Sequence, residues 1–374
     1  MQITKIAKLL IAVFALFGLL RVDAFAAANA GSAVPFLLIT PDSRATGMGD
    51  IGTAIADDIN AVYWNPAGLG FKGYINPEAE FEEDLIPYRQ VSLSFTKWLP
   101  QFNADLFYNA AAFGHYFEEI NGTVALNFVF MNMGEFTQTN NNGDEIGKFI
   151  SNEWTLGLSY GTKITEDLAI GAQLKFIQSN LAPKAVGMSD AGTGTSGGFD
   201  IGLLYKPTKL NLFGWNLNNK FSLGFNLQNI GPKVTYKNQS DPLPTNLRLG
   251  AALTIYRDEY NDLKISSDVS KTLVYRDDNG AKPIPANFTW AWKIPGVEVG
   301  VGLEYWYKYN NTPIVAIRGG YFNEPERLGK RKYFTFGAGV KYRMFNLDMS
   351  FINPLEENHP LANTMRFTLL IDWK

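Results

Sequence analysis

From about residue 88 to its C-terminus, the chain repeats segments in which apolar and polar residues alternate. In one such segment, Leu168, Ile170, Ala172, Leu174 and Phe176 alternate with Gly171, Gln173 and Lys175. Successive side chains of a strand point to opposite faces, so each segment has an apolar face and a face of polar residues or glycine. The segments run roughly ten residues or more, which exceeds the usual sandwich strand and matches a tilted bilayer-spanning strand. The pattern therefore predicts a transmembrane β-barrel.

The number of strands follows from the connections between the segments. Fifteen segments show the alternation: 88–98, 105–117, 121–133, 152–163, 167–179, 196–207, 219–229, 246–256, 261–271, 285–293, 296–309, 313–322, 333–343, 346–353 and 363–373. Single-chain bacterial barrels have an even number of strands, short periplasmic turns and longer outer loops. Removing the proline-flanked segment 285–293 restores this rule. The prediction is an all-β outer-membrane barrel of 14 antiparallel strands over residues 87–374.

The same rule sorts the connections between the two sides of the membrane. Short connections such as 118–120 and 310–312 are predicted to be periplasmic turns. The long outer loops are expected at 134–151, 180–195, 230–245 and 272–295. The connection 207–218 falls on the periplasmic side and is longer than its neighbours.

Residues 1–30 have the pattern of a secretory signal peptide. Lys5 and Lys8 precede the apolar run Leu9–Leu20, and small residues suited to cleavage follow. The run is too short to cross a bilayer as a helix. We expect export, cleavage of the signal peptide and insertion into the bacterial outer membrane.

Residues 31–86 lack the alternation and are rich in proline and glycine. A barrel of about eight strands is filled by its own side chains, whereas roughly 16–18 strands leave a channel. Fourteen strands lie between these cases, so we expect residues 31–86 to form an N-terminal hatch within the lumen. Charged residues predicted on the inner face of the wall would pair with one another or with the hatch acids Asp42, Asp57 and Asp58, although a substrate path through them is the alternative. They are Lys175, Arg248, Lys264, Asp268, Glu298, Glu304, Arg318, Lys341, Arg343 and Asp348.

Composition narrows the chemistry. The 374 residues include no cysteine and two histidines, which argues against disulfides, thiol chemistry and histidine metal clusters. The net charge of −3 gives no basic surface for nucleic acid. The run Gly47–Gly52 matches a dinucleotide-binding fingerprint but lacks the strand and helix that this site needs. His115 alone does not make a hydrolase. We expect no enzyme activity, cofactor or metal.

Two sets of motifs carry a family resemblance. Residues 57–69, with Trp64, Asn65, Pro66 and Gly68, resemble the hatch of FadL-type outer-membrane proteins, which are 14-stranded barrels with an N-terminal plug. Further stretches resemble the PorV/PorQ family of the type IX secretion system of Bacteroidota. They are residues 33–45, 47–50, 94–100, 302–307, 318–322, 330–335 and 360–368.

This resemblance implies a non-enzymatic role in protein transport. Such a barrel, held in outer-membrane lipid, would receive secreted cargo through the cargo's C-terminal sorting domain at the large barrel of the type IX translocon. It would then deliver the cargo to an attachment complex that contains a PorU-like sortase. The alternative is a FadL-like channel for hydrophobic small molecules such as fatty acids. That channel needs a lateral opening at a kinked strand, for which Gly224 and the pair Gly231–Pro232 are candidates.

Overall fold

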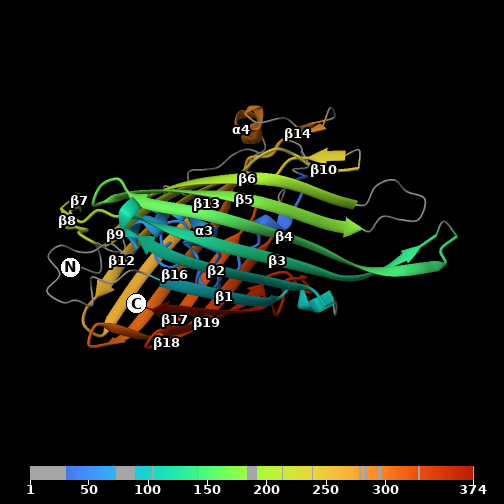
Figure 1. The fold of residues 1–374 in the computed structure, drawn as a ribbon. Helices are drawn as coiled ribbons and strands as arrows, with labels where there is room; N and C mark the ends of the chain where they lie inside the picture. Colours follow the sequence, from blue (N-terminus) through green and yellow to red (C-terminus); the bar gives the residue numbers. More distant parts are fainter. Residues whose placement is uncertain are drawn as a thin grey trace.

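The computed structural model describes residues 31–72, 89–102, 105–140, 142–182, 192–212, 214–237, 239–277, 280–281, 285–293, 296–326 and 329–373, so the predicted signal peptide and residues 73–86 lie outside it. Fourteen antiparallel strands close into one barrel (Figure 1). They are β1 (Arg89–Lys97), β2 (Phe107–Phe117), β3 (Gly122–Thr139), β4 (Glu145–Lys163), β5 (Leu168–Ala182), β6 (Gly192–Tyr205), β9 (Phe221–Ile230), β12 (Asn246–Arg257), β13 (Asn261–Thr272), β16 (Glu298–Tyr309), β17 (Thr312–Asn323), β18 (Lys332–Tyr342), β19 (Phe345–Pro354) and β20 (Met365–Trp373). Pairing of β1 with β20 closes the sheet.

These strands confirm the predicted fold class and the fourteen predicted segments. The rejected segment 285–293 is helical, with α4 (Ala286–Trp290) followed by a 3-10 turn, Ala291–Lys293. The long connection between β6 and β9, which is predicted to be periplasmic, contains its own hairpin, β7 (Asn211–Leu212) and β8 (Trp215–Asn216), which accounts for its length. Two outer connections carry similar hairpins: β10 (Val234–Tyr236) with β11 (Gln239–Asp241), and β14 (Arg276–Asp277) with β15 (Gly280–Ala281).

Strands β3 and β4 continue beyond the wall as a two-stranded ribbon. Their pairing resumes at Glu135↔Ile150, after a register shift, and runs to Thr139↔Glu145. The neighbouring strands stop earlier, because β2 pairs with β3 only as far as Asn132 and β5 pairs with β4 only from Asn152. Figure 1 shows this hairpin reaching past the other strands. We call residues 135–150 the outer ribbon; the sequence predicted only a loop here.

The alternation predicted from the sequence sorts side chains between lipid and lumen. On β5, Leu174 is 62% exposed, whereas Gln173 is buried. Trp98 and Tyr108, near the outer end of the wall, point inward: Trp98 lines a cavity and Tyr108 donates a hydrogen bond to the Ile39 carbonyl. Among the described residues, no helix is long and apolar enough to cross a membrane.

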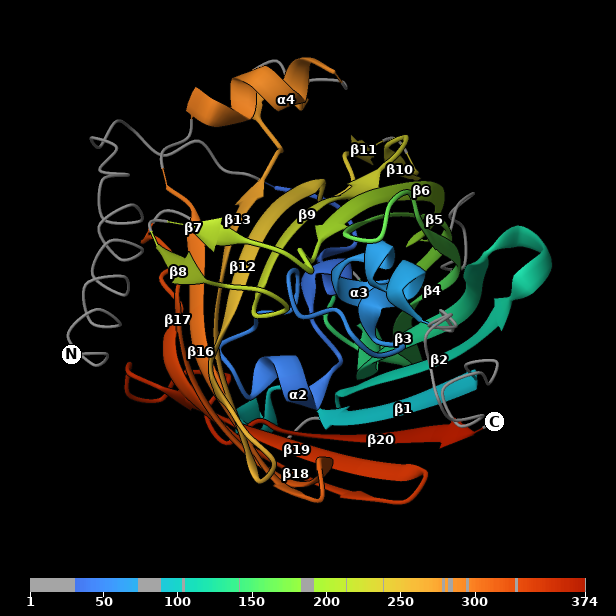
Figure 2. The same ribbon diagram turned by 90° about the vertical axis from the view of Figure 1, so that its left-hand side faces the viewer.

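Residues 31–72 lie inside the barrel, as the view along its axis shows (Figure 2). They form η1 (Pro35–Leu38), α2 (Ser43–Thr46), α3 (Ala61–Trp64) and η2 (Pro66–Phe71), joined by loops. Glycines on the inner face of the wall let this backbone lie directly against the strands. A Cβ atom at Gly302 would lie 2.2 Å from the Met48 carbonyl oxygen, and one at Gly224 would lie 2.1 Å from that of Thr53.

Candidate functional site: hatch contacts and the outer cavity

A buried ion cluster joins the hatch to the wall. Arg44, on α2, donates to both carboxylate oxygens of Glu304 on β16, with Nε at 2.8 Å and Nη2 at 2.9 Å. Arg318 on β17 donates its Nε to the same carboxylate at 2.9 Å. The Glu304 side chain is 1% exposed and that of Arg318 is fully buried. Such pairs need hydrogen bonds to offset the loss of water, and both oxygens of the Glu304 carboxylate receive them, although Nη2 of Arg318 has no acceptor among the described residues.

The ion cluster includes further acids of both the wall and the hatch. Arg318 donates its Nη1 to Asp348 on β19 at 2.6 Å, and Arg44 also contacts Asp57 and Asp58 of the hatch. Lys264 of β13 lies 3.7 Å from Asp57. The structure therefore brings together four of the hatch and wall acids that the sequence singled out for pairing: Asp57, Asp58, Glu304 and Asp348. It also adds Arg44, which sequence reasoning missed although it is the only Lys or Arg in residues 31–71.

Burial affects the hatch acids differently. Burial acts to raise the pKa of Asp57, but the charges of Arg44 and Lys264 outweigh it and hold that pKa well below its ordinary value. For Asp42, burial together with the charge of Asp58 raises the pKa. Asp42 is also the N-cap of α2, and its side chain accepts hydrogen bonds from the backbone N–H groups of Arg44 and Ala45. The hatch thus contains one carboxyl group whose pKa is held low by neighbouring cations and one whose pKa is raised to about 7.

Other predicted residues hold the hatch or brace the wall. Asp268 accepts hydrogen bonds from the backbone N–H groups of Gly52 and Thr53, each at 2.9 Å. Arg248 lies over the ring of Trp64, 5.0 Å from its centroid. Lys175 faces inward too, but it pairs with another wall residue, Asp200, at 2.7 Å.

Arg343 does not line the lumen. It lies in the turn after β18, is exposed and packs over Tyr342. The alternation that suggested an inward side chain stops where the strand ends, and Arg343 has a positive φ of 53°. Its predicted placement is corrected accordingly. Lys341, also expected inward, lies one residue before the strand end and pairs with Asp372 of β20 at 3.5 Å.

The hatch motif folds around its own backbone. Asn65 donates its side-chain amide to the carbonyl oxygens of Thr53, at 2.9 Å, and of Leu203 in β6, at 3.0 Å. Its oxygen accepts from the N–H of Ala67, which caps η2 at the point where Pro66 begins it. Gly68 is required because a Cβ there would lie 2.0 Å from a backbone oxygen. This motif therefore fixes the hatch to β6.

The glycines of the run Gly47–Gly52 serve packing. Gly49 has a φ of 86° and lies against the backbone of Tyr321, and a Cβ at Gly52 would overlap the ring of Trp64. His115, the other tempting residue, accepts a hydrogen bond from Arg89 at 3.3 Å. Among the described residues, no three His, Cys, Asp or Glu side chains are grouped as metal ligands.

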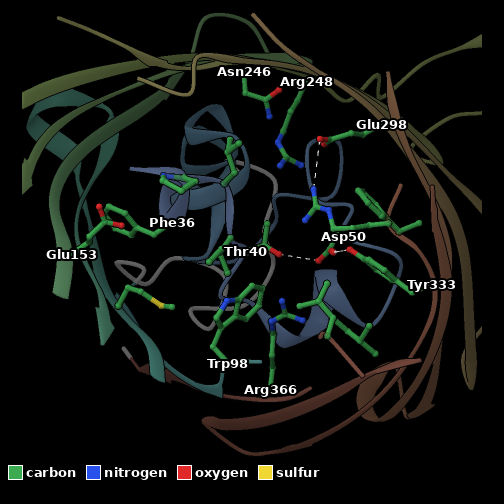
Figure 3. Close-up of a pocket in the computed structure, with 18 of the residues that line it drawn as sticks. Phe36, Thr40, Asp50, Trp98, Glu153, Asn246, Arg248, Glu298, Tyr333 and Arg366 are labelled. Atoms are coloured by element: carbon green, nitrogen blue, oxygen red, sulfur yellow. Dashed lines mark hydrogen bonds and ion pairs between the residues drawn. The ribbon is translucent and has the colours of Figure 1, made fainter. Parts of the chain in front are cut away.

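A cavity of about 400 Å³ lies on the outer side of the hatch (Figure 3). Its floor comes from hatch residues near η1, and its walls come from the outer halves of the strands. Its polar side chains are Thr40, Asp50, Glu153, Asn246, Arg248, Glu298, Arg331, Tyr333 and Arg366. Its apolar lining includes Phe36, Leu38, Ile39, Trp98, Met131, Met133, Phe322, Ile352 and Leu361. We call it the outer cavity.

The comparison with protein families is decisive. The model of the type IX secretion system protein PorV matches residues 26–279, more than half of the chain. The chain belongs to the PorV family. No curated protein matches the sequence.

Solved structures agree on the fold of this PorV-family chain. The Ralstonia pickettii toluene transporter TbuX is 13% identical, with a TM-score of 0.52, and the match covers 90% of this chain and 98% of that protein. The Pseudomonas putida toluene transporter TodX is 12% identical, with a TM-score of 0.51, covering 88% and 96%. A Pseudomonas aeruginosa FadL homologue is 12% identical, with a TM-score of 0.49, covering 90% and 98%.

The family and the fold together place the protein in a class. It is a FadL-like outer-membrane β-barrel of the type IX secretion system. The predicted recognition and fold are thereby confirmed.

Proposed function

We propose that this protein is a cargo shuttle of the type IX secretion system. It receives exported proteins at the large translocon barrel through their C-terminal sorting domain and carries them to a PorU-like sortase complex. Membership of the PorV family supports this role. The hatch, whose contacts reach most of the wall, keeps the lumen closed while cargo remains outside.

The observation that carries the proposal is the outer ribbon. Within the part of the chain that the structure describes, its residues pair only with each other, so both of its edges offer free backbone N–H and C=O groups. It also presents apolar side chains outside the wall: Phe136 is 47% exposed and Ile150 is 62% exposed. Exposed edges of this kind are avoided by most folds, because they recruit another strand. A β-rich cargo domain could add a strand to this edge and place its side chains on the apolar residues.

The test is a deletion with a matched control. Residues 134–150 are replaced by a two-residue turn, and the control variant loses the periplasmic hairpin β7–β8. Tagged proteins are then purified in mild detergent from a secreting strain, and bound proteins are identified by mass spectrometry. We expect wild type and control to retain exported proteins with a shared C-terminal domain, and the ribbon deletion to lose them. Undiminished capture by a folded, heat-modifiable deletion variant would overturn this role of the ribbon.

The second candidate is a channel for hydrophobic small molecules. The register shift between β6 and β9 near Phe199 and Ile201 marks a bulge, which is the kind of irregularity that a lateral opening uses. Of the predicted kink sites, Gly224 is explained by its hatch contact, and Gly231 approaches the Gly197 backbone of β6. Uptake of fatty acids and aromatic hydrocarbons by cells that express the protein, measured against cells that lack it, separates a channel from a shuttle.

A further inference from the structure

Arg366, which lines the outer cavity, forms no ion pair or side-chain hydrogen bond with any described residue. Arg366, on the inner face of β20, is only 2% exposed. Its guanidinium lies 5.6 Å from the centroid of the Trp98 ring. Its Nε and Nη1 atoms find no hydrogen-bond acceptor among the described residues. A buried cation without an anion is costly, so this position is prepared for an anion from outside the described chain.

The other buried arginines show what is missing. Arg318 is held by two carboxylates, and Arg331 at the cavity donates its Nε to Glu324 at 2.7 Å. The cavity acid Asp50 is already engaged, because Thr40 donates to it at 2.8 Å and the Tyr333 hydroxyl donates to its other oxygen. Arg366 therefore lacks the carboxylate that holds Arg318 and Arg331. Arg248, at the same cavity, also has an unpaired Nε among the described residues, but its guanidinium lies over the Trp64 ring on the hatch.

The cavity also holds an unused acceptor. Asn246, at the start of β12, is 1% exposed, and its side-chain oxygen has no donor among the described residues. In Figure 3 Asn246 lies on one side of the cavity, while Arg366 and Trp98 lie on the other. Apolar side chains, among them Phe36, lie between these two sides. A ligand that pairs with both residues must present an anion to Arg366 and an N–H donor to Asn246. Its body between these two groups must be apolar.

We propose that the outer cavity binds the free C-terminal end of a polypeptide, with Arg366 holding the terminal carboxylate and Asn246 accepting a backbone N–H. Arginine suits this task because its planar fork matches the two carboxylate oxygens. An alkyl carboxylate would satisfy Arg366 but has no N–H group for Asn246. The cavity lies on the side from which exported protein would approach. The inference rests on the proposed function only in taking the polypeptide to be the end of cargo.

A peptide-binding measurement tests it. The probe is Ser-Gly-Val-Leu with an N-terminal dansyl group, prepared both as the free acid and as the C-terminal amide. Its fluorescence anisotropy is followed with purified, detergent-solubilised protein. The variants are Arg366→Gln and, as a control, Arg343→Gln, which changes an exposed arginine outside the cavity. We expect the free acid to bind wild type and control alike, and Arg366→Gln to weaken it by about 10- to 100-fold, as loss of a charged hydrogen-bond pair does.

The amide gives the sharper comparison. It should bind wild type as weakly as the free acid binds Arg366→Gln, and Arg366→Gln should not weaken it further. Equal binding of acid and amide to wild type would overturn the proposal, even if Arg366→Gln failed to fold. Octanoate is the competing probe: if it displaces the peptide at equal concentration and Asn246→Ala weakens neither ligand, a peptide ligand is ruled out.

Cargo capture separates this inference from the proposed function. If wild type captures cargo but binds acid and amide equally, the inference fails and the shuttle stands. If the free acid binds through Arg366 but wild type captures no exported protein, the shuttle fails and the carboxylate site stands.

Discussion

Glu304→Gln is the substitution that most directly tests how the hatch is held. The Glu304 carboxylate accepts three hydrogen bonds from two arginines, one from the hatch and one from the wall. The amide of glutamine keeps the size of the side chain but removes its charge and replaces one acceptor oxygen with a donor. Arg44 and Arg318 would then face each other across a neutral group, with only their other carboxylates left.

The size of the effect follows from this geometry. Removing one partner of a fully buried ion pair typically costs about 3–5 kcal/mol, because the remaining charge stays buried. Both ends of this pair are buried, with side-chain exposures of 10% for Arg44 and 1% for Glu304, so no discount for solvent applies. At about 1.4 kcal/mol per factor of ten, the population of barrels with the hatch displaced should rise between about a hundredfold and a few thousandfold.

A single thiol measures that population. The chain has no cysteine, so Val62→Cys, at a hatch position that is 1% exposed, gives the only reactive site. Maleimide labelling in detergent should be slow in this background and should accelerate by the same factor when Glu304→Gln is added. Glu135→Gln, which removes an exposed pair with Lys148, is the control and should leave the rate unchanged. An unchanged rate for Glu304→Gln in a heat-modifiable barrel would refute the view that this cluster holds the hatch.

Three further outcomes are expected. Gly302→Val should accelerate the same labelling strongly, because its side chain would clash with the Met48 carbonyl oxygen of the hatch. Gly319→Ala is the control and should leave the rate unchanged, because its added Cβ would have no neighbour nearer than 4.0 Å. The labelling rate, divided by that of an unhindered thiol at the same pH, should increase as the pH rises above 3.8, the ordinary Asp42 value. A carboxyl group whose pKa is raised in the seated hatch stabilises the hatch in acid and loses that contribution as it ionises, so Asp42→Asn should flatten this corrected rise. Lys175→Met leaves Asp200 buried without its cation, so it should destabilise the barrel by about 3–5 kcal/mol. The temperature at which the barrel shows its heat-modified gel shift should fall accordingly. Adding Asp200→Leu to Lys175→Met should recover part of the lost stability.

The wall of the barrel was predictable because its pattern is local. Period-two alternation depends only on neighbouring residues, so it located all fourteen strands and the exposed side chains such as Leu174. The sequence predicted a loop at the outer ribbon, whereas the pairing of β3 with β4 resumes there at Glu135 and Ile150 after a register shift.

The contacts of the hatch depend on residues far apart in the chain, so the sequence located them less well. Glu304, Arg318 and Asp268 were recognised as inward charges, but their partners could not be assigned from spacing alone. Arg44 had a signal, as a single cation among hatch acids, that was passed over. Arg366 also had one, because it alternates with Met365 and Phe367 on β20. What the sequence did not show is that Arg366 lacks a partner.

The bond between α2 and the last strand has a consequence for biogenesis. The backbone N–H of Ser43 donates to the Thr368 hydroxyl at 3.0 Å, across 325 residues of sequence. The hatch is exported first, yet this partner is exported last, so the loop between them is among the longest and slowest that the chain can close. Once β1 meets β20, the wall surrounds a hatch that contacts strands all around it. We therefore expect assembly to proceed through an open sheet that curls around its own N-terminal segment, with closure of the seam as the final step.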